Sequence, residues 1–103
     1  MKRPNGHIFT GNKMKWEDIQ FKPHEIYTNG VQAVVHFPNG EWCSIGGCPY
    51  NEDKGMGGLY GNGETSFEIM SSSTEKRKYG VKGWLSKHQV MNHLRYLRNK
   101  EVA

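Results

Sequence analysis

The 103-residue chain is predicted to fold as an α+β domain, a three- to four-stranded antiparallel sheet with a C-terminal helix packed on one face. Two observations predict this class. In residues 31–45 and 64–70, successive side chains fall on alternate faces, with the two-residue period of a β-strand. Residues 86–97 instead carry apolar side chains at helical spacing behind strong start signals. In so short a chain, one helix lying across one sheet is the simplest packing.

The apolar side chains in the first part of the chain follow neither a clear helical nor a clear strand period. Residues 1–24 are therefore expected to form an N-terminal arm, and residues 25–103 a single α+β domain. The apolar side chains of the arm, Trp16, Ile19 and Phe21, are expected to pack it against that domain.

Residues 31–37 are β-branched and aromatic, which favours a strand. Asn39 and Gly40 follow, and an Asn-Gly pair tolerates positive φ at both central positions of a hairpin turn. A return strand is expected over residues 41–45. This segment is the clearest hairpin in the sequence.

Residues 46–63 hold seven of the 13 glycines and are expected to form a loop. The loop lacks phosphate-binding spacing and leads into a strand, so a hairpin connection is favoured over a recognition loop that would include Tyr60. A strand over residues 64–70, an exposed connection over 71–78 and a short strand over 79–84 are expected next.

The last element is a helix expected over residues 87–100. Ser86 stands at its N-cap position, and Gln89 completes a capping box three residues later. The apolar stripe that follows consists of Val90, Leu94 and Leu97. Trp84, just before this start, is expected to pack in the core.

Composition limits what the protein can be. A chain of this length supports one modest core, which excludes a two-domain enzyme or a barrel of eight βα units. No apolar run approaches the roughly 18 residues of a membrane helix, and no secretory signal is recognised. Two cysteines do not make a disulfide framework, so a reducing cytoplasm is expected.

Charge is distributed unevenly along the chain. Residues 1–75 carry six cations and nine acids, whereas residues 76–103 carry eight cations and one acid. With a helical turn of about 100° per residue, Lys87, Arg95 and Arg98 share one flank. The predicted contact surface combines this flank with the linker and the glycine loop and comprises Lys76, Arg77, Lys78, Lys82, Lys87, Arg95, Arg98 and Tyr60. An acidic protein, a nucleic acid and a merely solvated face remain alternatives for it.

Cofactor and enzyme motifs are weak. Cys43, Cys48, His88 and His93 form a set of ligands suited to zinc. Residues five apart on a helix, however, point about 140° away from each other. No hydrolase or metalloprotease motif is present. Neither a metal, a cofactor nor enzyme activity is therefore expected.

Six short segments share a familiar layout: Asn29-Gly30-Val31, Phe37-Pro38-Asn39-Gly40, Ser44-Ile45-Gly46-Gly47, Gly61-Asn62-Gly63, Phe67-Glu68-Ile69-Met70 and Val81-Lys82-Gly83-Trp84-Leu85-Ser86. This layout resembles small phage-encoded accessory proteins, most of them uncharacterised, over residues 29–97. Because most of these proteins are uncharacterised, the resemblance does not assign a catalytic residue to this chain. It implies a non-enzymatic protein that binds and inhibits a host or defence macromolecule in the host cytoplasm, as anti-CRISPR and other anti-defence proteins do. Direct nucleic-acid binding is the alternative, and an open β edge would permit a homodimer.

Overall fold

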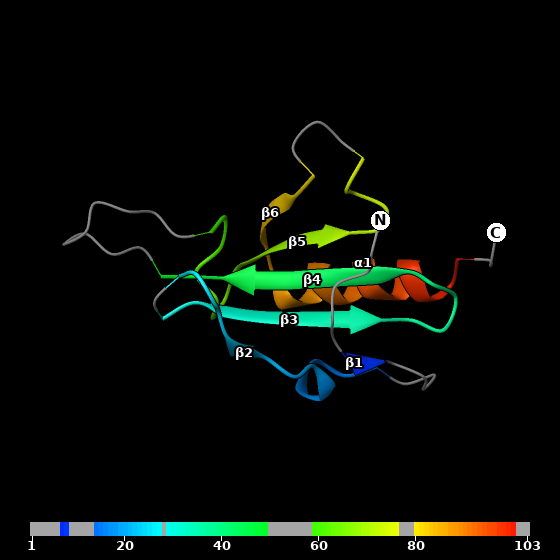
Figure 1. The fold of residues 1–103 in the computed structure, drawn as a ribbon, viewed down its shortest axis with the longest axis horizontal. Helices are drawn as coiled ribbons and strands as arrows, with labels where there is room; N and C mark the ends of the chain where they lie inside the picture. Colours follow the sequence, from blue (N-terminus) through cyan, green and yellow to red (C-terminus); the bar gives the residue numbers. More distant parts are fainter. Residues whose placement is uncertain (1–6, 9–13, 28, 50–58, 77–79, 101–103) are drawn as a thin grey trace.

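The computed structural model describes residues 7–8, 14–27, 29–49, 59–76 and 80–100. A single sheet is crossed on one face by the C-terminal helix, which confirms the α+β class (Figure 1). The elements, in chain order, are β1 (His7–Ile8), the 3-10 helix η1 (Trp16–Asp18), β2 (Lys22–Pro23), β3 (Val31–His36), β4 (Trp42–Gly47), β5 (Phe67–Ser71), β6 (Lys82–Leu85) and α1 (Lys87–Arg98).

The sheet contains more strands than the three or four predicted. Strands β3, β4, β5 and β6 are antiparallel neighbours in chain order and correspond to the four predicted strands. β2 adds a fifth antiparallel strand beside β3, and β1 pairs with β3 in parallel. Both extra strands are two residues long, too short to produce a recognisable alternation in the sequence.

The β3–β4 hairpin forms as predicted, but with a different turn. Gly40 has a positive φ of 92°, whereas Asn39 does not. The Gly40 N–H donates to the Phe37 carbonyl, and the Phe37 N–H donates to the Glu41 carbonyl. The turn is therefore a three-residue loop with only its glycine left-handed, not a two-residue turn with two left-handed residues.

Helix α1 begins with the predicted capping box. The Gln89 N–H donates to Ser86 Oγ, and the Ser86 N–H donates to Gln89 Oε1. The helix ends at Arg98, two residues earlier than expected, where the Asn39 side chain donates to the carbonyls of Leu97 (2.8 Å) and Lys100 (2.9 Å). The hairpin turn thus caps the end of the helix. None of the helices in the described part of the chain is long and apolar enough to cross a membrane.

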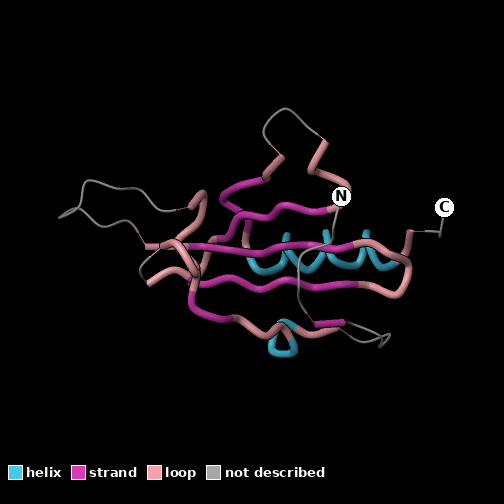
Figure 2. The backbone as a smooth tube through the Cα atoms, in the orientation of Figure 1, coloured by secondary structure: helices cyan, strands magenta, loops and turns pink. Residues whose placement is uncertain are grey.

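The core lies between α1 and one face of the sheet (Figure 2). The helix contributes Val90, Met91, Leu94 and Leu97. The facing strand residues are Ala33, Val35, Cys43, Ile45, Phe67 and Ile69. These strand positions alternate with residues on the opposite side, which is called the pocket face below.

The arm packs through the residues that were predicted to anchor it. Ile19 is buried, and the rings of Trp16 and Phe21 lie 4.8 and 5.8 Å from the Phe67 ring. Aromatic pairs at such distances add about 0.5–1.5 kcal/mol beyond their buried area. Residues 14–23 therefore share the core and the sheet of the residues that follow.

Candidate binding site

In the described part of the chain, the four residues of the zinc set do not come together as one group. Cys43 and Cys48 are buried, and Cys43 lies in β4 on the helix side of the sheet. Desolvation raises the pKa of Cys43, which disfavours the thiolate that a metal requires. His88 is exposed on α1. Among the described residues, no three His, Cys, Asp or Glu side chains are grouped closely enough to hold a metal ion.

His93 instead takes part in a hydrogen-bonded cluster that the sequence did not reveal. Its Nε2 lies 2.9 Å from Ser71 Oγ and 3.5 Å from Ser73 Oγ. A serine beside a histidine is the arrangement of a nucleophile and its base. Ser71 is, however, fully buried, so its hydroxyl cannot meet a substrate. The hydrogen bond between Ser71 and His93 joins the end of β5 to α1.

The glycine loop is only partly described, because residues 50–58 lie outside the described residues. Its later part is a compact turn around Asn62, whose Oδ1 accepts from the backbone N–H groups of Glu64, Thr65 and Ser66. Because these residues form a turn, β5 begins at Phe67, three residues later than predicted. A Cβ at Gly61 would lie 2.6 Å from the backbone of Phe67, so glycine is needed there for close packing.

The predicted basic surface is divided between two places. Lys76 is exposed after β5, Lys82 is half-buried in β6, and Arg77 and Lys78 lie outside the described residues. On α1, Lys87 and Arg95 are exposed and Arg98 is half-buried. Lys87 and Arg98 are separated by eleven residues of helix, about 16 Å along its axis.

The cations on α1, and Lys100 just after it, already contact other groups of the protein. The Lys87 ammonium lies 5.5 Å from the Trp16 ring centre. Arg95 Nη1 donates to Asn92 Oδ1, and Arg98 Nε donates to Asn99 Oδ1. Lys100 Nζ lies 2.9 Å from Glu41 Oε1. These contacts make the flank a poor continuous track for phosphates, which require outward-facing cations.

Trp84 is not in the core, contrary to expectation. Its side chain is 67% exposed, and its φ is 57°. Leu85 packs against the core instead. Phe67 and Ile69 of β5 pair with Leu85 and Lys82 of β6, so β6 carries an extra residue in this stretch, where Trp84 has its left-handed backbone. A left-handed backbone costs a residue with a side chain roughly 1–2 kcal/mol.

Tyr60 lies beside Trp84. The Trp84 N–H donates to the Tyr60 carbonyl at 2.7 Å, and a Cβ at Gly83 would overlap the Tyr60 side chain. Tyr60 is itself 60% exposed. The glycine loop and β6 thus bring the backbones of two exposed aromatic residues together, and Lys82 lies two residues before Trp84 in β6. These three residues, Tyr60, Lys82 and Trp84, are called the aromatic edge below.

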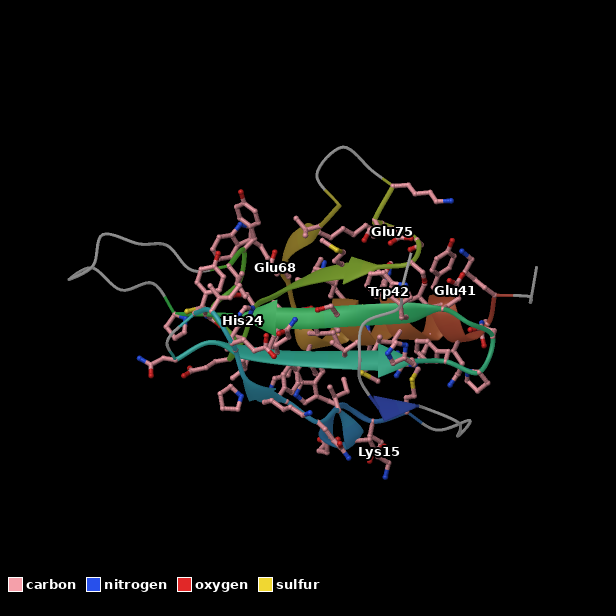
Figure 3. All side chains as sticks on the ribbon, in the orientation of Figure 1. Lys15, His24, Glu41, Trp42, Glu68 and Glu75 are labelled. Carbon is pink, nitrogen blue, oxygen red and sulfur yellow. The ribbon has the colours of Figure 1, made fainter. Side chains whose placement is uncertain are left out.

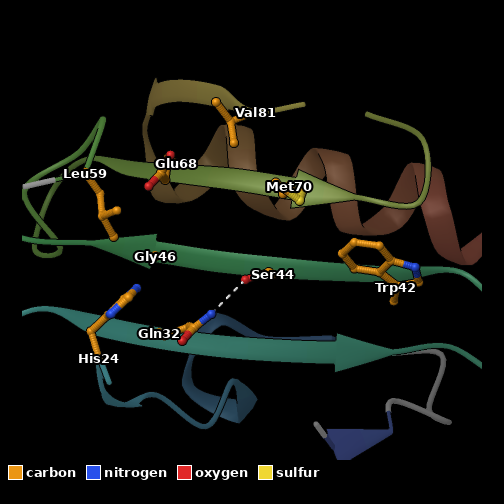
Figure 4. Close-up of a pocket in the computed structure, with 9 residues that line it drawn as sticks. All are labelled: His24, Gln32, Trp42, Ser44, Gly46, Leu59, Glu68, Met70 and Val81. Carbon is orange, nitrogen blue, oxygen red and sulfur yellow. Dashed lines mark hydrogen bonds between the residues drawn. The ribbon is translucent and has the colours of Figure 1, made fainter. Parts of the chain in front are cut away.

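A pocket of about 300 Å³ lies on the pocket face of the sheet (Figure 4). The described residues that line it are His24, Gln32, Trp42, Ser44, Gly46, Leu59, Glu68, Met70 and Val81. Gly46 pairs with Gln32 on one side and with Glu68 on the other, so three strands meet at its floor. Sequence reasoning missed this pocket, because it depends on the register of those three strands.

Two polar side chains of the pocket, His24 and Gln32, are held by hydrogen bonds within the protein. His24 Nδ1 accepts from the backbone N–H groups of Ile26 (3.1 Å) and Tyr27 (3.3 Å), which leaves the ring proton on Nε2. Gln32 Nε2 donates to Ser44 Oγ at 3.2 Å. His24 and Glu68 lie toward the same end of the sheet, with Trp42 toward the other (Figure 3).

Glu68 is half-buried, and the described residues give it neither an ion pair nor a hydrogen bond. Desolvation raises the pKa of its carboxyl group above the ordinary value of 4.5. The carboxylate has therefore lost part of its hydration without gaining a partner among the described residues. Perturbed groups in clefts are candidates for functional sites.

Comparison with known proteins found no matching family model, no matching curated protein and no matching solved structure.

Proposed function

We propose that this chain is a small non-enzymatic phage accessory protein that binds and inhibits a host or defence protein through the aromatic edge. One observation carries the proposal: Trp84 keeps a strained backbone while exposing 67% of its side chain to solvent. Strained residues persist where the surrounding structure holds them, and they cluster at binding and active sites. Exposed Trp and Tyr are also enriched among the residues that dominate the affinity of protein interfaces.

The choice of a protein partner follows from the charges. A nucleic-acid surface needs cations that are available to phosphates, whereas Lys87, Arg95 and Lys100 contact groups of this protein. The aromatic edge combines two exposed aromatic residues with one lysine, which suits an apolar patch with acidic residues at its rim. The resemblance to phage accessory proteins supports inhibition by steric blocking.

The test is capture of the partner by the full-length chain from host lysate, with identification by mass spectrometry and affinity measurement on the purified partner. Trp84→Gly should lower affinity by at least tenfold, because it removes the indole ring from the aromatic edge. Glycine also accepts a φ of 57°, so the stability of the variant should be unchanged or higher by up to about 1 kcal/mol. Truncating an interface side chain does not usually raise the stability of the free protein, so a gain in Trp84→Gly would reflect relief of its backbone strain.

Tyr96 provides the matched control, since it is 55% exposed on α1, away from the aromatic edge. Tyr96→Ala should leave affinity within about twofold. Wild-type affinity in Trp84→Gly would overturn the proposal. Reversing Arg95 and Arg98 to Glu should have a smaller effect, mainly on the association rate.

The salt dependence of the affinity distinguishes direct nucleic-acid binding from binding to a protein. Aromatic rings beside a lysine could also stack on bases. In that case the captured material would be nucleic acid, and affinity would fall steeply with salt concentration as counterions are released. Capture of a protein with a shallow salt dependence supports the proposal as stated.

A further inference from the structure

We propose that the pocket on the pocket face binds a ligand with a primary ammonium or guanidinium group on an apolar stem, with Glu68 as the counter-ion. This inference does not depend on the proposed function, because the pocket and the aromatic edge are different sites. It rests on three features of the pocket: an unpaired carboxylate, a missing side chain at the floor, and apolar walls that end at a hydrogen-bond donor.

The carboxylate determines the sign of the ligand. Glu68 lines the pocket half-buried, with no ion pair or hydrogen bond to the described residues. An uncompensated carboxylate is unfavourable in such a place, and a cation within about 4–6 Å reverses the penalty. His24 Nδ1 is already occupied by two backbone N–H donors, those of Ile26 and Tyr27. Among the described residues that line the pocket, Glu68 is the one carboxylate, and none is a lysine or an arginine.

Gly46 creates the space beside that charge. It stands opposite Gln32 on β3 and opposite Glu68 on β5, so a side chain there would project between them. A Cβ at Gly46 would lie 3.1 Å from Leu59 Cδ1, the flexible end of a side chain. A methyl group could thus be accommodated, whereas a branched side chain would occupy the pocket itself.

The walls define the rest of the ligand. Leu59, Met70 and Val81 provide apolar contacts for an alkyl stem beside Glu68. The volume of about 300 Å³ lies at the lower end of the range for small-molecule sites. His24 carries its ring proton on Nε2, and Figure 4 shows this side chain across the pocket from Glu68. A ligand with a hydrogen-bond acceptor several bonds from its cation would match both ends.

Titration of the full-length chain followed by NMR amide shifts tests the proposal. The probes are n-butylammonium, agmatine and N-acetyl-lysine methylamide, with N-acetyl-norleucine methylamide as a neutral analogue and butyrate as an anion. The cations should shift the amides of Gly46 and Glu68 and bind with a Kd of about 1 mM, as expected for ligands of this size. The neutral and anionic probes should bind at least tenfold more weakly.

Two variants act on different features of the pocket. Glu68→Gln removes the charge but keeps the shape, and Gly46→Val fills the space but keeps the charge. Each should weaken cation binding at least tenfold. Gly46→Ala provides a milder substitution if the valine variant does not fold. Glu64→Gln is the control, since Glu64 is an exposed acid outside the pocket, and it should bind as the wild type does.

Absence of binding by every cationic probe would overturn the proposal, as would equal binding of the neutral analogue or unchanged binding by Glu68→Gln. Among the supporting outcomes, preference for agmatine or butylammonium indicates a free amine as the ligand. Preference for N-acetyl-lysine methylamide indicates a basic side chain presented by a peptide or protein.

Discussion

The two faces of the sheet are built from the same strands but have different surroundings. On the helix side, Val35, Ile45 and Ile69 have no exposed surface. On the pocket face, at neighbouring positions of β4 and β5, Ser44, Glu68 and Met70 remain partly exposed around a cavity. An antiparallel sheet permits this division because its side chains alternate between faces. One face can therefore provide the stability of the fold while the other is left for binding.

The largest expected difference between the faces is in stability. Leu94→Ala should lower the free energy of unfolding by about 2–5 kcal/mol, because Leu94 is fully buried between α1 and the sheet. Met70→Ala removes an apolar side chain that is 39% exposed on the pocket face and should cost less than about 1 kcal/mol. Urea denaturation of both variants measures the contrast. Equal losses would show that the pocket face contributes to the core as much as the helix side does.

A smaller effect is expected where the helix is joined to the β3–β4 turn. Asn39→Ala should cost about 1–2 kcal/mol, because it removes the donor to the carbonyls of Leu97 and Lys100. Asn39→Asp should cost as much or more, since a carboxylate would face the same carbonyls and the negative end of the helix dipole. Thermal unfolding measures both.

Asn99→Ala is the control for this pair, because Asn99 is exposed at the C-cap and its side chain receives only the Arg98 bond among the described contacts. It should cost less than about 0.5 kcal/mol. If Asn39→Ala behaves like Asn99→Ala, the turn does not hold the helix end.

The smallest effect is a pH dependence on the pocket face. Burial raises the pKa of Glu68 above 4.5, so the folded protein holds this proton more tightly than the unfolded chain does. The stability contribution of Glu68 is therefore most favourable below about pH 4.5 and declines as the pH rises through the folded-state pKa. Glu68→Gln should slightly raise the Tm at pH 7, and this gain should shrink toward pH 4.

Glu64→Gln is the control for the pH measurement, because Glu64 is exposed and should show no such gain. A Tm that falls at pH 7 in Glu68→Gln would mean that the carboxylate is stabilised in the folded protein. That result would contradict the idea that Glu68 lacks a partner.

Several features could be predicted from the sequence because they depend on neighbours along the chain. The start of α1 follows from Ser86 and Gln89, whose hydrogen bonds span three residues. The β3–β4 hairpin follows from alternation and from a glycine in the turn. The packing of Trp16, Ile19 and Phe21 follows from their apolar character within a polar segment.

Other features depended on the tertiary structure because residues distant in the chain compete for one place. Leu85 and Trp84 were both suited to the core, and the pairing of Leu85 with Phe67 decided which one was buried. Asn39 served as a turn residue in the sequence, and only the folded chain brings it to the end of a helix 58 residues away. The pocket needs Gln32, Gly46 and Glu68 in line across three strands, and their register is set by tertiary packing. Local hydrogen bonds and periodicity thus determined the elements, whereas the register and competition for burial determined the surfaces available for binding.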